Sequence, residues 1–343
     1  MKKLAYLTIA GLTMFSAGVI AEDEIDLEFY GKAHVSAGYL YDGNNGGLNA
    51  SSNSSRVGLK ANYRVSETLE LIGQVERGVD FTDGSSTFKA RSSYLGLQGD
   101  WGTVRVGYYT SPTMALLSKV EEFRDRAGEG RNIVRQGAAN LDRRLKSSVH
   151  YQSPNWQGFT FALQYGTTET TGTTSTDNDD DVINTSLTYQ VNDWTFLAGY
   201  QHDNRDVSQT VKGTRLAAIR NGDGWRVAAI TQYVDGLKDA GTVTPTSMTS
   251  WGVTGRYQLS NDLWLRGQVF AREYKDTQNE SVLATIGVDR VLSSKLTWYG
   301  LATATQNKAG AAASVTGGGY GDSMAVVLGD DPFAISTGLI FKF

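Results

Sequence analysis

The chain contains no cysteine, only four prolines among its 343 residues, and no long apolar run after its first 21 residues. The absence of cysteine excludes a disulfide framework and thiol chemistry. The absence of a later apolar run excludes a transmembrane helix, because a helix needs about twenty apolar residues to cross a bilayer. The 32 basic and 36 acidic residues are intermixed along the chain, which argues against nucleic acid as a partner.

The N-terminus has the pattern of a secretory signal. Lys2 and Lys3 precede the apolar run Leu4–Phe15, and small residues up to Ala21 form a cleavage pattern. The run is too short for a membrane anchor. We therefore expect residues 1–21 to be removed and residues 22–343 to form a single domain. Loss of the two lysines changes the formal charge from −4 to −6.

Most of the remaining chain alternates between apolar and polar residues. In the range Leu27–Tyr41, seven residues of odd number are apolar or aromatic, whereas Lys32 and His34 lie on the other parity. A period of two predicts β-strands with one apolar face. Sixteen such segments start near Leu27, Ser54, Leu69, Phe88, Gly102, Arg144, Gly158, Val182, Trp194, Gly213, Trp225, Ser247, Leu263, Ser281, Lys295 and Phe333.

Two segments depart from this alternation. Within Ala90–Gln98 the parity of Tyr94 conflicts with that of Leu95 and Leu97, which predicts a β-bulge. In Gly213–Arg220 the pattern does not identify the apolar face.

The connections between these segments alternate in length. Short turns such as Ser260–Asp262 alternate with long connections such as Asp42–Asn53 and Gln306–Pro332. Composition leaves two classes open, a soluble all-β secreted protein and an outer-membrane β-barrel. The regular alternation favours an up-and-down transmembrane barrel, in which all short turns lie at one end and all long loops at the other. A Greek-key sandwich does not require its connections to alternate in length. Aromatic residues at the segment ends, including Tyr41 and Trp194, are typical of membrane-interface girdles.

The longest break in the pattern is Thr110–Asp142, which we call the inserted segment. It has no period of two and carries a charged block, Glu121–Arg126. Long connections on rigid scaffolds commonly carry function. The alternative is a solvated surface loop whose ion pairs contribute little.

Several stretches resemble the general diffusion porins of Gram-negative outer membranes. They are FYGKAHVSAGY, SSRVGLKANY, RSSYLGLQGDWGTVRVGYY and the terminal strand ending in Phe343. The resemblance implies an all-β fold, a 16-stranded antiparallel up-and-down transmembrane β-barrel, whose long third external loop, residues 110–142, folds inward to narrow the channel. It also implies a homotrimer in contact with outer-membrane lipid and lipopolysaccharide. Phe343 would be the assembly signal read by the barrel-assembly machinery.

The resemblance also implies a basic cluster on the channel wall. Its members are Lys32, Arg56, Lys60, Lys89, Arg91 and Arg144. Parity independently places Lys32, Arg56 and Lys60 on the polar face. For Lys89 and Arg91 the expected bulge weakens that argument, and Arg143 is an alternative to Arg144.

Acidic residues of the inserted segment would face this cluster. The resemblance assigns the constriction to Glu121, Glu122 and Asp125, with Phe123 as the anchor of the loop. Opposed charges across a narrow opening create a transverse field that favours small polar solutes. The sequence leaves open which of the three acids faces the lumen.

Other candidate chemistry is weak. His34, His150 and His202 lack the spacing of a zinc site. Asp177–Asp181 lacks the glycine and distal glutamate of a calcium loop. Gly317–Gly319 does not join a strand to a helix, as a phosphate loop would. We expect no metal, no cofactor and no catalytic residue.

The sequence therefore predicts an outer-membrane channel for passive diffusion of small hydrophilic solutes and ions. A porin selective for a sugar or other metabolite is one alternative. A second, from another class, is an enzyme or adhesin that uses the barrel as an anchor.

Overall fold

The computed structural model describes residues 25–84, 88–135, 141–167, 181–206, 209–237, 246–275 and 277–343. The predicted signal at residues 1–21 lies outside the described residues, as do four of the five residues of Asp177–Asp181. No helix among the described residues is long and apolar enough to span a membrane.

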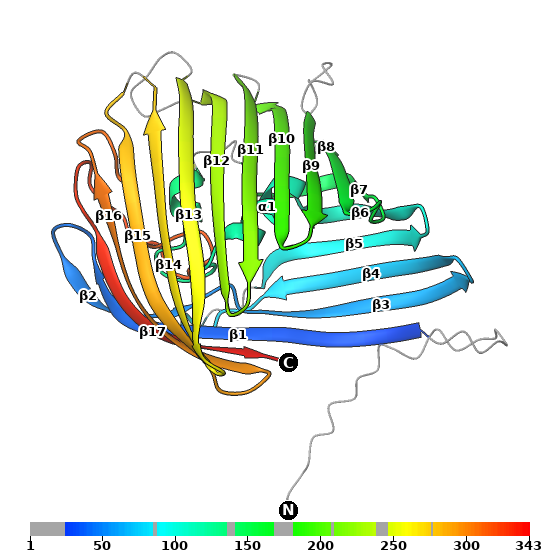
Figure 1. Ribbon diagram of the computed structural model, residues 1–343, viewed down its shortest axis with the longest axis horizontal. Coiled ribbons are helices and arrows are strands. Elements are labelled where there is room, and N and C mark those ends of the chain that lie inside the picture. The colour runs from blue at the N-terminus through cyan, green and yellow to red at the C-terminus, as the bar shows by residue number, and fades with distance from the viewer. Residues whose placement is uncertain are drawn as a thin grey trace, which may run out of the picture.

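The described chain is almost entirely strand (Figure 1). The strands are β1 (Ile25–Tyr41), β2 (Gly46–Ser52), β3 (Arg56–Ser66), β4 (Leu69–Gly78), β5 (Lys89–Gly99), β6 (Gly102–Thr110), β7 (Arg144–Gln152), β8 (Phe159–Thr167), β9 (Asp181–Val191), β10 (Trp194–Asp206), β11 (Gln209–Gly222), β12 (Trp225–Leu237), β13 (Thr246–Ser260), β14 (Leu263–Tyr274), β15 (Glu280–Val291), β16 (Leu296–Asn307) and β17 (Phe333–Lys342). Two helices, α1 (Pro112–Val120) and α2 (Arg131–Val134), lie between β6 and β7.

The strands form one closed antiparallel barrel. From β3 onward each strand pairs with the next strand in sequence, and β1 closes the ring by pairing with β17 from Lys32↔Lys342 to Tyr41↔Phe333. β3 pairs with the first half of β1 and β2 with the second half, so the two together occupy one place in the wall. The barrel is therefore sixteen-stranded, as the alternation predicts.

One strand was not expected. β2 falls inside Asp42–Asn53, which the sequence predicts to be a loop. Its residues GGLNASS have no alternation, because Gly46 and Gly47 provide no apolar side chain. The strand forms because its backbone groups pair with the protruding end of β1.

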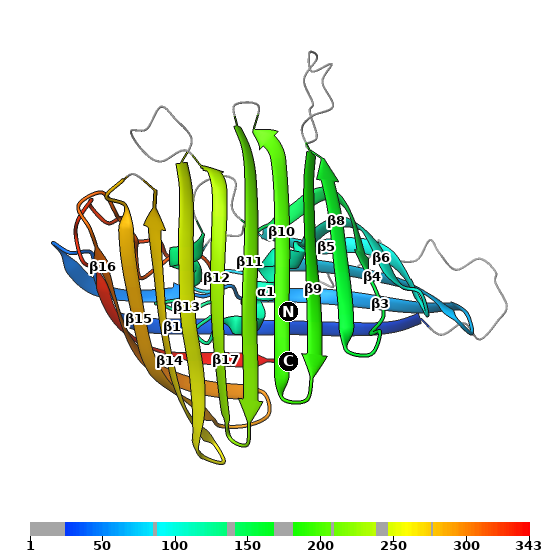
Figure 2. The same ribbon diagram turned by 45° about the horizontal axis from the view of Figure 1, so that its top comes forward.

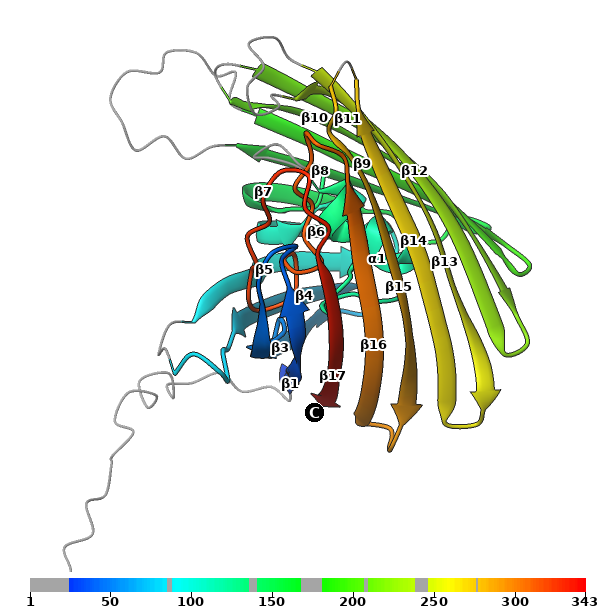
Figure 3. The same cartoon turned by 90° about the vertical axis from the view of Figure 1, so that its left-hand side faces the viewer.

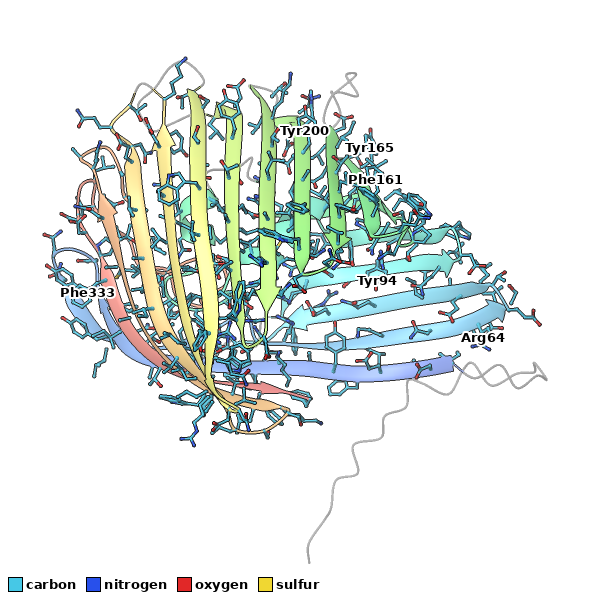
Figure 4. All side chains as sticks on the ribbon, viewed as in Figure 1. Arg64, Tyr94, Phe161, Tyr165, Tyr200 and Phe333 are labelled. Carbon is cyan, nitrogen blue, oxygen red and sulfur yellow. The ribbon has the colours of Figure 1, made fainter. Side chains whose placement is uncertain are left out.

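The two faces of the wall differ in chemistry. Outward side chains are apolar and exposed; for example, Leu27 is 60% exposed and Phe29 65%. Figure 4 shows Phe161, Tyr165 and Tyr200 on the outward side of the wall. Inward positions carry buried polar side chains such as Gln232 and Gln268. Because the apolar face points outward and the polar face inward, the wall suits a barrel that is surrounded by lipid and has a polar interior.

The two irregular segments have structural explanations. The predicted bulge is present, since the register between β4 and β5 shifts between Val75 and Arg77. In β11, Leu216 points outward, yet the inward Ala217 and Ile219 are also apolar and pack in a core cluster with residues of α1. A helix against the inner face therefore removed the alternation that would identify the outward face.

Short turns and long loops lie at opposite ends of the barrel. The turns that join β9 to β10, β11 to β12 and β13 to β14 lie together at one end (Figure 2), which we call the short-turn end. Figure 3 shows the two helices between the walls of the barrel rather than outside them.

Candidate functional site

The inserted segment begins with a capped helix. Ser111 Oγ accepts a hydrogen bond from the Met114 amide at 3.3 Å, and Pro112 occupies the first turn, where its missing N–H costs nothing. The helix ends at Glu121, whose N–H donates to the Leu117 carbonyl. The sequence SPT thus starts α1 immediately after β6.

One face of α1 packs on the inner wall. Leu116, Leu117 and Val120 are almost fully buried. Their cluster includes residues of β10, β11 and β12, namely Leu197, Ala217, Ile219, Ala228 and Ile230. Burial of such a side chain contributes about 1.5–3 kcal/mol. The helix is therefore fixed to one side of the barrel.

A buried ion pair ties both ends of the segment to β11. Arg215 Nη1 and Nη2 donate to Asp142 Oδ1 at 2.7 Å and Oδ2 at 3.0 Å. Arg215 Nη1 also donates to the Thr113 carbonyl at 2.8 Å. Both charged side chains are fully buried. Removing one partner of such a pair typically costs about 3–5 kcal/mol.

The middle of the segment is anchored on β15 and β16. Phe123 is fully buried in a cluster that includes Tyr299. Arg126 donates to both carboxylate oxygens of Asp289, at 2.6 and 2.9 Å. The Arg126 guanidinium also lies 4.2 Å from the centre of the Tyr299 ring, a cation–π contact.

Glu122 is held by arginines of the wall. Its Oε1 accepts from Arg226 and its Oε2 from Arg266. Arg256 Nη1 lies 4.0 Å from the same Oε2. The carboxylate is buried and its charge is neutralised from β12, β13 and β14.

Asp125 pairs with the first strand, on the other side of the barrel seam from β16. Its Oδ2 accepts from Lys32 Nζ of β1 at 2.7 Å. Its φ of +62° is in the left-handed region that aspartate tolerates better than most residues. Although burial alone would raise the pKa of Asp125, the Lys32 ammonium holds this pKa below its usual range.

Two further acids are buried inside the segment. Glu121 Oε1 accepts from the Arg131 amide at 2.6 Å, and Glu129 Oε2 accepts from the Asp125 amide at 2.7 Å. Burial raises the pKa of Glu121 to about 7. Burial and then the Glu121 charge raise the pKa of Glu129 to about 8.

The last long connection, residues 308–332, packs on the inserted segment. The Gly128 amide donates to the Val315 carbonyl at 2.6 Å, and the Gly319 amide donates to Glu129 Oε1 at 3.2 Å. A Cβ at Gly318 or Gly319 would collide with the Glu129 or Asp125 carboxyl group. The glycine run that the sequence shows therefore serves close approach between two loops.

Three predicted basic residues meet on the wall of β3, β5 and β7. Arg56 Nε lies 3.3 Å from Glu76 Oε2, and Arg91 Nε lies 2.5 Å from Glu76 Oε1. Arg144 Nε donates to Ser92 Oγ at 3.2 Å. One carboxylate thus balances a cluster of three guanidinium groups.

Arg124 extends from the inserted segment without a partner. Its side chain is exposed and makes no ion pair or hydrogen bond with the residues that the structure describes. Its charge is attracted by Asp125 and Glu121 of the segment itself and repelled by Arg56 and Arg144 of the wall. The exposed charged group that the segment presents to this wall is therefore the Arg124 guanidinium, which is basic.

Two predicted basic residues lie apart from this cluster. Lys60 Nζ pairs with Glu28 Oε2 at 2.9 Å, and both side chains are largely exposed. Lys89 is exposed at the loop end of β5, with Nζ 3.9 Å from Asp80 Oδ2. Among the described residues, neither forms an ion pair with the inserted segment.

Phe343 lies where the chain ends against β1. Its amide and carbonyl both pair with backbone groups of Gly31, and its ring lies 6.0 Å from that of Phe29. The histidines described on strands hold structural contacts: His34 Nε2 lies 3.0 Å from Tyr299 Oη. Within the described ranges no group of His, Cys, Asp and Glu could hold a metal ion.

Sequence reasoning missed the arginines on the far wall, Arg226, Arg256 and Arg266. A signal for them existed, because the outward parity of Trp225, Val227 and Tyr233 places Arg226 inward. They were not singled out because the resemblance covered mainly the first strands, and because nothing in the sequence brings Glu122 to them.

Comparisons with known proteins agree with this architecture. A family model described as Gram-negative porin matches residues 7–310. The major outer membrane protein P.IB of Neisseria gonorrhoeae is 27% identical over 118 residues, which cover 34% of each chain. A chitoporin of Vibrio furnissii is 27% identical over 239 residues, 61% of this chain and 62% of that protein. The matches thus span between a third and two thirds of these relatives.

Solved structures show the same fold over nearly the whole chain. An anion-selective porin from Comamonas acidovorans superposes with a TM-score of 0.80 at 20% identity, covering 93% of this chain and 100% of that one. The trimer form of OmpT from Vibrio cholerae gives a TM-score of 0.69 at 16% identity, with 94% and 100% covered.

Proposed function

Because the chain belongs to the Gram-negative porin family, we propose that it forms a water-filled channel for passive diffusion of small hydrophilic solutes and ions across the outer membrane. The observation that carries this proposal is a closed sixteen-stranded wall with a polar inner face. The inserted segment lies against this inner face and is held there by ion pairs to several strands. A polar path inside an apolar outer surface is what passive diffusion requires.

The inserted segment, residues 110–142, narrows the path in this proposal. Glu122 and Asp125 bind it to two different walls, and Phe123 anchors it between them. Glu121 holds the segment's own backbone through the Arg131 amide. The acids thus position the segment, and their charges are already neutralised by partners.

The opening then lies between the segment and the wall of β3, β5 and β7. Its charged groups are Arg56, Arg91, Arg144 and Arg124 against the single Glu76. Lys32 is a further basic group at this opening, and Asp125 balances its charge. Lys60, in the middle of β3, and Lys89, at the loop end of β5, add charge along the same wall.

This imbalance supports a second, more specific proposal: the channel prefers anions. Rings of one charge sign set ion preference in a narrow pore. The solved relative from Comamonas acidovorans is described as anion-selective, which is consistent with a basic constriction. Selectivity for a single metabolite has less support, although one relative is a chitoporin.

We further propose a homotrimer in contact with outer-membrane lipid and lipopolysaccharide. A solved structure with this fold is a trimer form. The exposed apolar belt supplies the surface for lipid and for neighbouring copies. Phe343, paired with Gly31 at the barrel seam, is proposed as the signal read by the barrel-assembly machinery.

Single-channel recording in planar bilayers tests the function. We expect stepwise ohmic conductance and, across a KCl gradient, a reversal potential on the anion side. Saturable block by a neutral sugar would favour the metabolite-selective alternative. Absence of any conductance from correctly folded protein would contradict both and favour a barrel that anchors an enzyme or adhesin.

A further inference from the structure

Three arginines form a row on the inner wall. Arg226 of β12 is the direct cross-strand partner of Arg256 of β13, and Arg256 is the direct partner of Arg266 of β14. Like charges directly opposite each other destabilise a sheet. The row therefore needs negative charge in front of it.

The protein supplies only part of that charge. Glu122 accepts from Arg226 and Arg266, whereas Arg256 is 38% exposed and approaches the same carboxylate only to 4.0 Å. Asp289 pairs with Arg266 but is shared with Arg126. These groups carry four positive and two negative charges, which leaves a surplus of two.

A polar pocket opens beside the row. It has a volume of about 360 Å³, and its polar lining includes the three arginines, Lys119, Asn221 and Gln190 together with Glu121 and Glu122. Lys119 is exposed at the end of α1 and has no ion-pair partner within the described part of the chain. Its charge offsets that of Glu121, so the local surplus is two when Glu121 is ionised and three when it is protonated. The two amide side chains add hydrogen-bonding groups.

The pocket is separate from the cluster proposed to line the opening. Arg226 starts β12 and Arg256 and Arg266 flank the turn from β13 to β14, so the pocket faces the short-turn end. Arg56, Arg91 and Arg144 lie on β3, β5 and β7 instead. The inserted segment contacts both regions, with Glu122 at one and Asp125 at the other.

We propose that this pocket binds a small polyvalent oxyanion, such as inorganic phosphate or a short dicarboxylate. Planar guanidinium groups donate paired hydrogen bonds to such oxygens, and an ammonium group adds a point charge. A monovalent ion such as chloride would leave at least half of the surplus unbalanced. A role for this site in the passage of anions rests on the proposed function, because it presupposes that the protein is a channel.

Equilibrium dialysis of the full-length, detergent-solubilised protein against radiolabelled inorganic phosphate tests the site without requiring conduction. We expect saturable binding that excess chloride displaces poorly. Arg256→Gln removes one guanidinium group but leaves Glu122 paired with the other two arginines. This variant should bind phosphate about tenfold more weakly, which is the loss expected for one charge-assisted contact.

The matched control is Arg64→Gln. Arg64 lies at the end of β3 beside its tight turn (Figure 4), so this variant removes the same charge from the same end of the barrel but on another wall. Phosphate affinity should not change. Equal weakening in both variants would mean a diffuse electrostatic effect and would overturn the site.

Two further results separate the possibilities. If Arg256→Gln does not fold, Lys119→Gln, on the surface of α1, carries the same expectation. Loss of binding in Arg56→Ala with none in Arg256→Gln or Lys119→Gln would place the anion on the opposite wall and overturn the proposal. Conductance without saturable phosphate binding overturns this site alone, whereas phosphate binding without conductance overturns the proposed function and leaves the site standing.

Discussion

Lys32 of β1 and Asp125 of the inserted segment form an ion pair, with Nζ 2.7 Å from Oδ2, between residues 93 apart in sequence. The pair joins the first strand to a segment that also contacts the wall from β9 to β16. It therefore fixes how far the segment stands from the wall of β3 to β7.

Asp125→Asn should make the channel more anion-preferring. Asparagine accepts the left-handed backbone at this position, so the change removes charge with little strain. Lys32 would then lose its partner and contribute its charge to the opening. The measurement is the reversal potential in a KCl gradient. Asp322→Asn, in the last long connection, is the control, and an equal shift in both would contradict the local effect.

Arg91→Ala should move selectivity toward cations. The change removes one basic charge and also releases Glu76, which Arg91 and Arg56 share. Arg56→Ala should act in the same direction. Lys60→Ala is the control, because the Lys60 charge is already balanced by Glu28 and lies apart from Glu76, so its loss should shift the reversal potential less. Unchanged reversal potentials in both arginine variants would remove the basis for assigning them to the constriction.

The packing of the inserted segment should weaken as pH rises. Glu121 and Glu129 have pKa values raised to about 7 and about 8, so the folded state retains protons that the unfolded chain loses near pH 4.5. Stability from these groups is complete below the unfolded pKa and is lost as pH passes the folded values. Proteolysis within residues 121–135 should therefore be faster at about pH 9 than at about pH 5.

Glu129→Gln tests the cause of that dependence. Glutamine keeps an acceptor for the Asp125 amide but cannot ionise. The variant should show a flatter profile across the same pH range. A wild-type rate that falls with pH, or a variant with an unchanged profile, would contradict this account.

Phe123→Ala should loosen the segment without dismantling the barrel. Removal of a fully buried phenylalanine typically costs about 3–5 kcal/mol. We expect a lower thermal midpoint, faster proteolysis of the segment and noisier single-channel currents. Phe81→Ala is the control, because Phe81 is 58% exposed in a loop. Identical currents and midpoints for both variants would mean that Phe123 is not an anchor.

The proposed homotrimer should survive in mild detergent and dissociate on heating. Light scattering on unheated protein measures the mass directly. A single species with the mass of one chain, about 37.2 kDa for the full sequence, would contradict the trimer.

The strands could be predicted because their alternation follows from a lipid-facing side and a polar side. All sixteen barrel strands were located, and the bulge near Arg91 was found from a parity conflict. β2 was missed because Gly46 and Gly47 carry no pattern. The outward face of β11 could not be chosen, because α1 buries Ala217 and Ile219 on its inner side.

The site was harder to predict than the wall. Parity indicated which side of a strand Lys32 and Arg56 occupy, but not which partners they have. Whether Glu122 faces the opening depends on how the inserted segment crosses the barrel. That path is set by tertiary contacts such as Arg215 with Asp142, between residues 73 apart. No local pattern in the sequence records such contacts.

Because α1 packs on the inner face of β10 to β12, the barrel is two layers thick on that side, the thick side, whereas no residue of β3 to β7, the thin side, belongs to the cluster that holds α1. In the proposed channel the passage for water is consequently eccentric, displaced toward the thin side. Substitutions on the thick side should therefore appear in genetic screens as loss of protein from the membrane. Those on the thin side should appear as altered uptake by cells with normal amounts of the protein.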